Sequence, residues 1–173
     1  TSPDITLLRL NDSPPAGAVF SGWDAGSQTR SATAIGIHHP RGDLLKLSTG
    51  VIDGGTNCVM DSAGGVTCTS DSATSMNGTY YRVKWSQGTT EGGSSGSAIF
   101  AQSGNTRYVV GALHGGAASC QNPNGSDFYG RFQRSFAAGI GGWLTKWRDC
   151  CSGIGGLTLQ CRRIKPRQPF LAQ

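Results

Sequence analysis

A serine set among glycines is the residue of this chain whose surroundings best suit covalent chemistry. Ser95 lies in the segment GGSSGSAIF, residues 92–100, where an apolar run follows the glycines at once. Glycines permit a turn tight enough to expose a hydroxyl, and the N–H groups of Gly93 and Ser95 could bind the oxygen that becomes negative when a carbonyl is attacked. The alternative is a flexible Gly/Ser loop without chemistry, and the segment alone does not decide between the two.

Acids and histidines that could assist such a serine are few. Asp4 stands directly before the apolar run ITLL, and Asp127 follows Asn-Gly-Ser, but either carboxylate could simply belong to a turn. His38 and His39 are adjacent, so on a strand they point to opposite faces and cannot easily share a metal ion. We therefore predict no metal site at this pair, and we predict no cofactor.

Short apolar or β-branched segments separated by turn residues dominate the chain, and glycine, with 27 of 173 residues, is more than twice as frequent as usual. This pattern predicts an all-β barrel or sandwich. The predicted strands are 5–10, 19–23, 32–38, 45–52, 80–85, 97–101, 108–114 and 128–132, with one helix over 136–148. We predict one domain over residues 1–149, followed by a Gly-rich and then basic linker or disordered tail over 150–173.

The net charge of +5 lies in the C-terminal tail. Basic and acidic residues cancel over residues 1–145, so no phosphate-binding face is expected on the domain and no nucleic-acid partner is predicted. No apolar run approaches the length of a bilayer, so no membrane partner is predicted either.

Six cysteines without a C-x-x-C pair favour disulfides in an oxidising compartment over a zinc site, and hence a secreted protein. Cys58 and Cys68 flank a turn-rich stretch, so a local bridge that closes a hairpin is predicted. Cys120 has no obvious local partner.

In their order along the chain, several segments resemble those of the chymotrypsin-fold serine proteases, and most closely those of the bacterial lysyl endopeptidases. The matching segments are DITLL at 4–8, AIGIHHP at 34–40, GSSGS at 93–97, LHGG at 113–116 and SDFYGR at 126–131. The resemblance implies the trypsin-like double Greek-key β-barrel fold, here the C-terminal barrel and the end of the N-terminal one, with one C-terminal helix.

The resemblance also implies a role for individual residues. It implies that Ser95 is the nucleophile, that Asp4 is the acid that orients the catalytic imidazole, and that the amides of Gly93 and Ser95 form the oxyanion hole. It also implies that Asp127 is the pocket acid for a basic side chain. The strand and pocket wall that bind substrate would be Leu113, His114 and Gly115. Thr89 stands where trypsin-type proteases carry their specificity acid, so the basic preference rests on Asp127 alone. Ser94 replaces an aspartate that many animal proteases use in activation, and the lysyl endopeptidases share this serine.

The catalytic histidine of this fold precedes the aspartate in the chain, and none of the three histidines here does so. We therefore expect a truncated fragment or one chain of a two-chain protein, which is inactive alone and needs the missing N-terminal segment to complete its fold. The family's bridge from the cysteine matching Cys120 to one near the N-terminus agrees with this. The complete protein is expected to be a secreted serine endopeptidase cleaving after Lys, with Arg left open, through an acyl-enzyme. The alternatives are a non-catalytic homologue that binds basic peptides, and an extracellular β-sandwich binding module.

Overall fold

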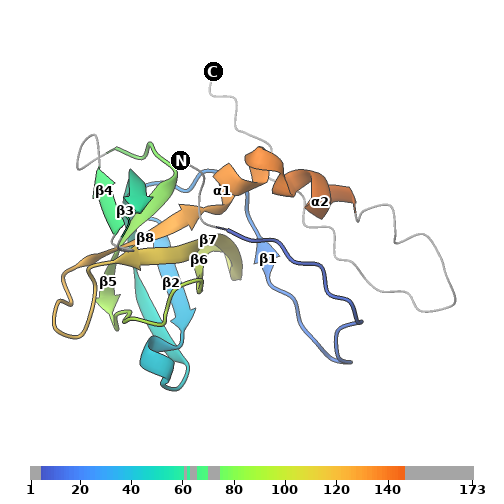
Figure 1. The fold of residues 1–173 in the computed structure, drawn as a ribbon, viewed down its shortest axis with the longest axis horizontal. Helices are drawn as coiled ribbons and strands as arrows, with labels where there is room; N and C mark the ends of the chain where they lie inside the picture. Colours follow the sequence, from blue (N-terminus) through green and yellow to red (C-terminus); the bar gives the residue numbers. More distant parts are fainter. Residues whose placement is uncertain (1–4, 61, 63–65, 70–74, 147–173) are drawn as a thin grey trace, which may run out of the picture.

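The computed structural model describes residues 5–60, 62, 66–69 and 75–146 (Figure 1). Its strands are β1 (Gly22–Trp23), β2 (Thr33–His38), β3 (Lys46–Met60), β4 (Val66–Thr69), β5 (Tyr80–Gln87), β6 (Ala98–Ser103), β7 (Thr106–Gly116) and β8 (Ser126–Arg131). A 3-10 turn, Pro40–Gly42, follows β2, and the last elements of the described part are α1 (Phe132–Ser135), a π-helical turn (Phe136–Ile140) and α2 (Gly141–Lys146). None of the helices in these residues is long and apolar enough to span a bilayer.

Six of the strands close into a barrel. Around the ring the order is β2-β3-β5-β8-β7-β6, and β6 pairs again with β2. The first three strands of the ring are in chain order, with β4 outside the ring between β3 and β5, and the last three are in reverse chain order. This is a Greek-key arrangement. In Figure 1 the barrel lies to the left of the helices, and the blue segment that precedes β1 extends away from it.

The barrel core is built from side chains at alternate strand positions. On β5, Tyr81, Val83 and Trp85 point inward and are buried, and they pack with residues such as Ile99 of β6. Alternation of this kind is the period-two pattern of a sheet with one buried face. A Cβ on Gly36 would lie 2.9 Å from the Trp85 ring, so this glycine makes room for the largest core side chain.

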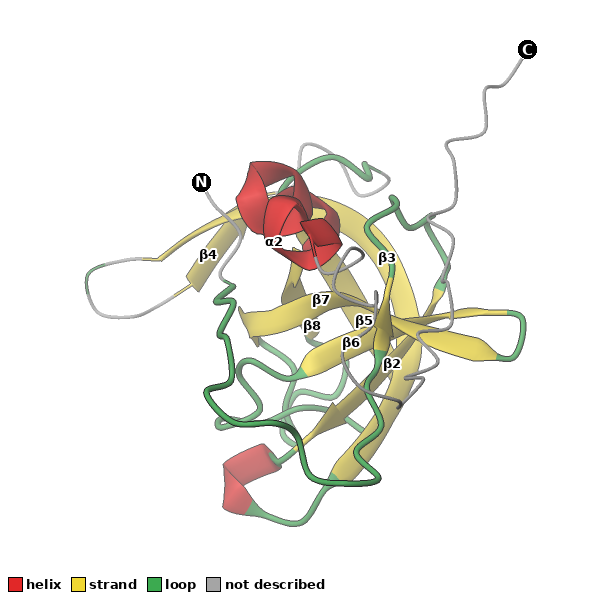
Figure 2. Ribbon diagram, turned by 90° about the vertical axis from the view of Figure 1, so that its right-hand side faces the viewer, coloured by secondary structure: helices red, strands yellow, loops and turns green. Residues whose placement is uncertain are grey.

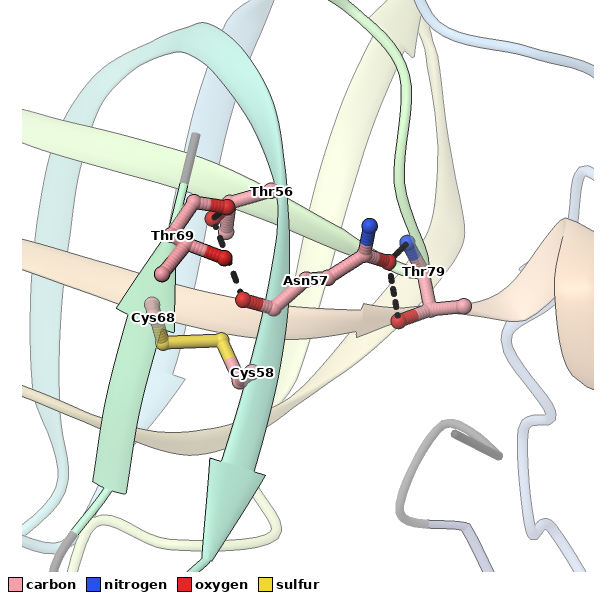
Figure 3. Close-up of a disulfide and its surroundings, with 6 residues drawn as sticks. All are labelled: Thr56, Asn57, Cys58, Cys68, Thr69 and Thr79. Carbon is pink, nitrogen blue, oxygen red and sulfur yellow. Dashed lines mark hydrogen bonds between the residues drawn. A yellow bond between two sulfur atoms is a disulfide. The ribbon is translucent and has the colours of Figure 1, made fainter. Parts of the chain in front are cut away.

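The β3–β4 hairpin projects from the barrel and carries a disulfide (Figures 2 and 3). Cys58 and Cys68 face each other in the pairing of the two strands and are bonded. Beside the bridge, the Thr56 hydroxyl donates to the Thr69 carbonyl at 2.5 Å, and the Asn57 side chain accepts from the backbone N–H of Thr79 at 3.1 Å. The predicted local bridge is therefore confirmed.

The all-β prediction is confirmed as a closed barrel, and the sandwich alternative is wrong because β7 and β8 pair and complete the ring. The predicted strand over 5–10 is also wrong. This segment forms no strand, and Leu8 is 80% exposed, because within the described residues no neighbouring strand offers the partner that its backbone needs. The helix begins at Phe132, earlier than predicted, and residues beyond 146 lie outside the described part.

Candidate active site

The turn that carries Ser95 joins β5 to β6 at one end of the barrel. Ser94 N–H donates to the Glu91 carbonyl at 3.0 Å, and Ser97 N–H donates to the Ser94 carbonyl at 3.2 Å, so two tight turns follow one another. Gly93 has φ of +89° and Gly96 has φ of +80°, a region that only glycine enters without strain. The glycines thus shape the turn, and Ser95 between them is exposed.

Backbone N–H groups alternate between bonded and free along this turn. Within the described residues, the amides of Gly93 and Ser95 donate to no protein acceptor, whereas those of Ser94, Gly96 and Ser97 do. Unbonded backbone N–H groups are the donors that an oxyanion-binding site uses, so these two amides are candidates for that role. A flexible loop would not be expected to separate bonded and free amides in this way.

The turn is fastened to the residues that follow β2. Arg41 N–H donates to the Gly92 carbonyl at 2.8 Å, and a Cβ on Gly93 would lie 3.3 Å from the Arg41 nitrogen. The 3-10 turn of Pro40–Gly42 and the β5–β6 connection therefore lie at the same end of the barrel, as Figure 1 shows. This contact limits how far Gly93 can move.

Asp127 is a buried carboxylate on β8, with 1% of its surface exposed. Its Oδ2 accepts from Trp85 Nε1 at 2.7 Å and from the Thr90 hydroxyl at 2.6 Å. Burial raises the pKa of Asp127, and hydrogen bonds from Thr90, Trp85 and the Ala118 backbone oppose that rise. Among the residues that the structure describes, no Lys or Arg forms an ion pair with Asp127.

The end of β7 runs beside the turn of residues 92–97, the nucleophile turn, which carries the candidate nucleophile Ser95. Gly96 N–H donates to the Leu113 carbonyl at 2.7 Å, and Leu113 N–H donates to the Ser97 carbonyl at 2.9 Å. The pairing of β7 with β6 ends at Ala112, one residue earlier, whereas Gly115 still pairs with Phe128 of β8. Leu113 therefore already uses its N–H and C=O within the protein, and strand pairing with a substrate would fall to the residues after it.

The three histidines occupy three different environments. The His38 ring lies inside the barrel with 2% exposure, His39 is exposed with Nδ1 3.0 Å from the Asp43 carbonyl, and the His114 ring packs on Tyr80 with centroids 5.2 Å apart. His38 is the last residue of β2 and His39 lies just beyond it, and the two differ in burial, with His38 buried and His39 exposed. Within the described residues, none of the three is hydrogen-bonded to Ser95, and Asp4 lies outside those residues.

The His38 ring contacts the residue next to the nucleophile candidate, a contact that the sequence did not predict. Its Nδ1 lies 3.0 Å from Ser94 Oγ and its Nε2 lies 3.0 Å from Ser48 Oγ. A histidine at an inward position of a strand could have signalled a buried polar partner, but not which one. No sequence pattern marked Ser48.

A hollow of 440 Å³ opens beside the 3-10 turn of Pro40–Gly42 and the start of the β5–β6 connection. It is lined by Pro40, Arg41, Asp43, Lys46, Leu47, Ser48, Gly88, Thr89, Glu91, Cys120 and Gln121. At its wall Glu91 accepts from Cys120 N–H at 2.8 Å and pairs with Arg41 Nε at 3.2 Å, and these contacts, led by the Cys120 backbone, lower the pKa of Glu91. Cys120 itself is exposed and carries no disulfide within the described part of the chain.

Comparison with known proteins identifies the family. The profile of the lysyl endopeptidase C-terminal domain matches residues 1–130. A lysyl endopeptidase of Pseudomonas aeruginosa strain PAO1 is 37% identical over 144 residues, which cover 78% of this chain and 28% of that protein. The chain belongs to the lysyl endopeptidase C-terminal domain family, and it spans less than a third of that relative's length.

A search of solved structures finds a weaker likeness. An inactive serine-to-alanine mutant of Rv3671c from M. tuberculosis H37Rv aligns with a TM-score of 0.46 and 15% identity, over 82% of this chain and 59% of that one.

Proposed function

We propose that this chain forms the nucleophile-bearing part of a secreted serine endopeptidase that cleaves after lysine, with cleavage after arginine left open. The observation that carries the proposal is the exposed residue Ser95 in a turn with two unbonded amides, on Gly93 and on Ser95 itself. A carbonyl attacked by Ser95 would place its developing negative charge against those two N–H groups. The acyl-enzyme would then be hydrolysed by water.

The preference for a basic side chain rests on Asp127. A buried carboxylate without a cationic partner favours Lys or Arg over a neutral guest, because a neutral guest leaves the charge unpaired. The Trp85 and Thr90 donors hold the carboxylate in one orientation, so a substrate cation would meet it preorganised. His114 and Gly115, beyond the end of the β6 pairing, would bind the substrate backbone by strand addition.

An active enzyme would also need a base for the Ser95 proton, because a serine hydroxyl alone is a weak nucleophile. We propose that a longer form of the protein supplies a histidine oriented by Asp4. On this view the segment alone would be inactive, and the disulfide on the β3–β4 hairpin agrees with secretion into an oxidising compartment.

Covalent labelling tests the proposal. A fluorophosphonate probe should label Ser95 in the full-length protein, and the Ser95→Ala variant should remain unlabelled. Peptide substrates that differ only at the residue before the cleaved bond should then show cleavage after Lys. A folded full-length protein that the probe does not label would refute the catalytic proposal.

One observation favours a second candidate function. Because no histidine of the described part contacts Ser95, the chain could instead come from a non-catalytic homologue that binds basic peptides through Asp127. Such a homologue would bind Lys-containing peptides without cleaving them, and its Asp127→Ser variant would lose that binding. The labelling experiment separates the two functions directly.

A further inference from the structure

A chain of buried polar side chains runs beneath the nucleophile turn, and the His38 ring is at its centre. His38 ends β2, Ser48 lies on β3 and Ser94 lies on the turn itself, and each is at most 2% exposed. Both ring nitrogens lie 3.0 Å from a serine oxygen. A single imidazole therefore joins two barrel strands to the residue that precedes Ser95.

The outer contacts of the two serines decide where the imidazole proton lies. The Ser48 hydroxyl donates to the Thr89 carbonyl at 3.2 Å, so its oxygen must accept from His38, which requires a proton on Nε2. In a neutral ring Nδ1 is then an acceptor, and the Ser94 hydroxyl donates to it. Ser94 Oγ in turn accepts from Glu91 N–H at 3.3 Å.

The opposite tautomer leaves this network incomplete. With the proton on Nδ1, the Ser48 hydroxyl would turn toward Nε2 and the Thr89 carbonyl would lose its donor. The Ser94 hydroxyl proton would also lose its acceptor. Buried polar groups are nearly always paired, so the neutral Nε2–H form is the one that the surroundings select.

The surrounding charges leave that neutral form in place. Burial lowers the pKa of His38; Asp127 on β8 opposes this, and the adjacent His39 adds to it. Two ion pairs near the same end of the barrel balance their own charges. They are Arg41 with Glu91 at 3.2 Å and Lys46 with Asp43 at 3.1 Å. At neutral pH His38 is therefore an uncharged acceptor toward Ser94.

We propose that neutral His38 is a positioning residue for the nucleophile turn. By accepting a hydrogen bond from the Ser94 hydroxyl at Nδ1, it holds the residue that lies between the two free amides, on Gly93 and Ser95, and so would fix the position of both. His38 touches no reacting atom and acts only through Ser94. The inference rests on the proposed protease function and adds a residue that this function alone does not require.

Substitutions that keep one ring contact each test the inference in the full-length enzyme. Asn at position 38 offers an acceptor near the place of Nδ1, whereas Gln offers a donor near the place of Nε2. His38→Gln should lower kcat about 10²-fold with KM within about twofold, because misaimed amides weaken transition-state binding alone. His38→Asn should restore most of kcat.

Ser94→Ala should lower kcat as His38→Gln does, and the double variant should be no slower than either single variant because the two residues act through one contact. His39→Asn is the matched control, since the His39 side chain is exposed and its ring is hydrogen-bonded to the Asp43 carbonyl and not to Ser94, and it should leave kcat unchanged. A His38→Gln enzyme with wild-type kcat, or multiplicative losses in the double variant, would overturn the inference.

A spectroscopic measurement reads the same contact without turnover. In the full-length Ser95→Ala protein, nitrogen NMR of the His38 ring should show a proton on Nε2 and none on Nδ1 at neutral pH. A proton on Nδ1 would overturn the inference. A wild type that no probe labels would refute the proposed function, whereas a labelled wild type with an indifferent His38→Gln variant would refute this inference alone.

Discussion

Asp127 and His38 are both buried side chains of the same barrel, yet their surroundings favour different outcomes. Asp127 has three hydrogen-bond donors and no cation beside it in the described residues, so a guest with positive charge completes its environment. His38 has its two serines and needs nothing further. The first arrangement agrees with the proposed role of Asp127 in binding a basic side chain, and the second suits a structural support.

Replacing the pocket acid should separate specificity from reactivity. In Asp127→Ser, the preference for Lys over a neutral residue should fall by on the order of 10⁴, because the unpaired buried charge that rejects neutral guests is gone. Peptide series that vary the residue before the cleaved bond would measure this, and the fluorophosphonate should still label Ser95. Asp53→Ser is the control, since Asp53 pairs with Arg82 at 2.7 Å away from the pocket and should keep the Lys preference. An unchanged preference in Asp127→Ser would show that another group selects the substrate.

His38 should make the free energy of unfolding depend on pH. Its folded-state pKa lies below the ordinary value of 6.5, so its stabilising contribution is complete above 6.5 and is lost as pH falls through the folded-state pKa. Denaturant unfolding of the wild type and of His38→Asn, compared from pH 7.5 to 5, should show a smaller loss for the variant. Asp127 has the opposite pH dependence, because its raised pKa favours the folded state at low pH. Both proteins contain Asp127, so subtracting one pH series from the other leaves the contribution of His38. If the free energy of unfolding changed equally with pH in both proteins, the lowered pKa of His38 would be contradicted.

At the scale of elements, the shape of the nucleophile turn depends on the backbone conformation of its glycines more than on any side chain. Gly93 combines a positive φ with the close approach of Arg41, so two independent constraints demand the absence of a side chain. Gly104, in the β6–β7 turn, has φ of +59° but open space around it. Comparing substitutions at Gly93 and Gly104 therefore separates the cost of backbone strain from an effect on the oxyanion amides.

Both Gly93→Ala and Gly104→Ala should lower the free energy of unfolding by about 1 kcal/mol, because each forces alanine into the left-handed region. Only Gly93→Ala should also slow labelling of Ser95 in the full-length protein, by about 10²-fold, through displacement of an oxyanion amide. Denaturant unfolding and probe-labelling rates measure the two effects. Equal labelling rates in both variants would remove Gly93 from the oxyanion site.

The disulfide on the β3–β4 hairpin should contribute stability without contributing to the chemistry. It spans ten residues of sequence, for which chain entropy gives about 3 kcal/mol. Replacing both Cys58 and Cys68 by Ser should lower the thermal midpoint, measured by calorimetry, while the rate of Ser95 labelling below that midpoint stays unchanged. A slower rate would mean that the hairpin supports the turn.

Over the whole molecule, the sequence predicted what depends on local pattern. Alternating apolar residues located most of the strands, and the glycines around Ser95 located the turn. The sequence could not predict pairing over long separations, so the strand wrongly placed at 5–10 and the contact of His38 with Ser94, 56 residues away, were both beyond local pattern. The hydrogen bond from Trp85 to Asp127 is a further instance, because no local pattern places these two residues side by side. The predicted boundary near residue 149 stays a prediction, because it lies outside the described residues.

The closure of the barrel by β8 sets an order of events during synthesis and folding. This strand is the last of the ring to leave the ribosome, it must pair with β5 and β7 at once, and it brings the Asp127 carboxylate with it. Such long-range pairing is slow to form. A nascent chain that has already made the Ser95 turn therefore still lacks both a closed ring and the Asp127 carboxylate. If Asp127 binds the substrate side chain as proposed, substrate selection would be acquired only when folding of the barrel is complete.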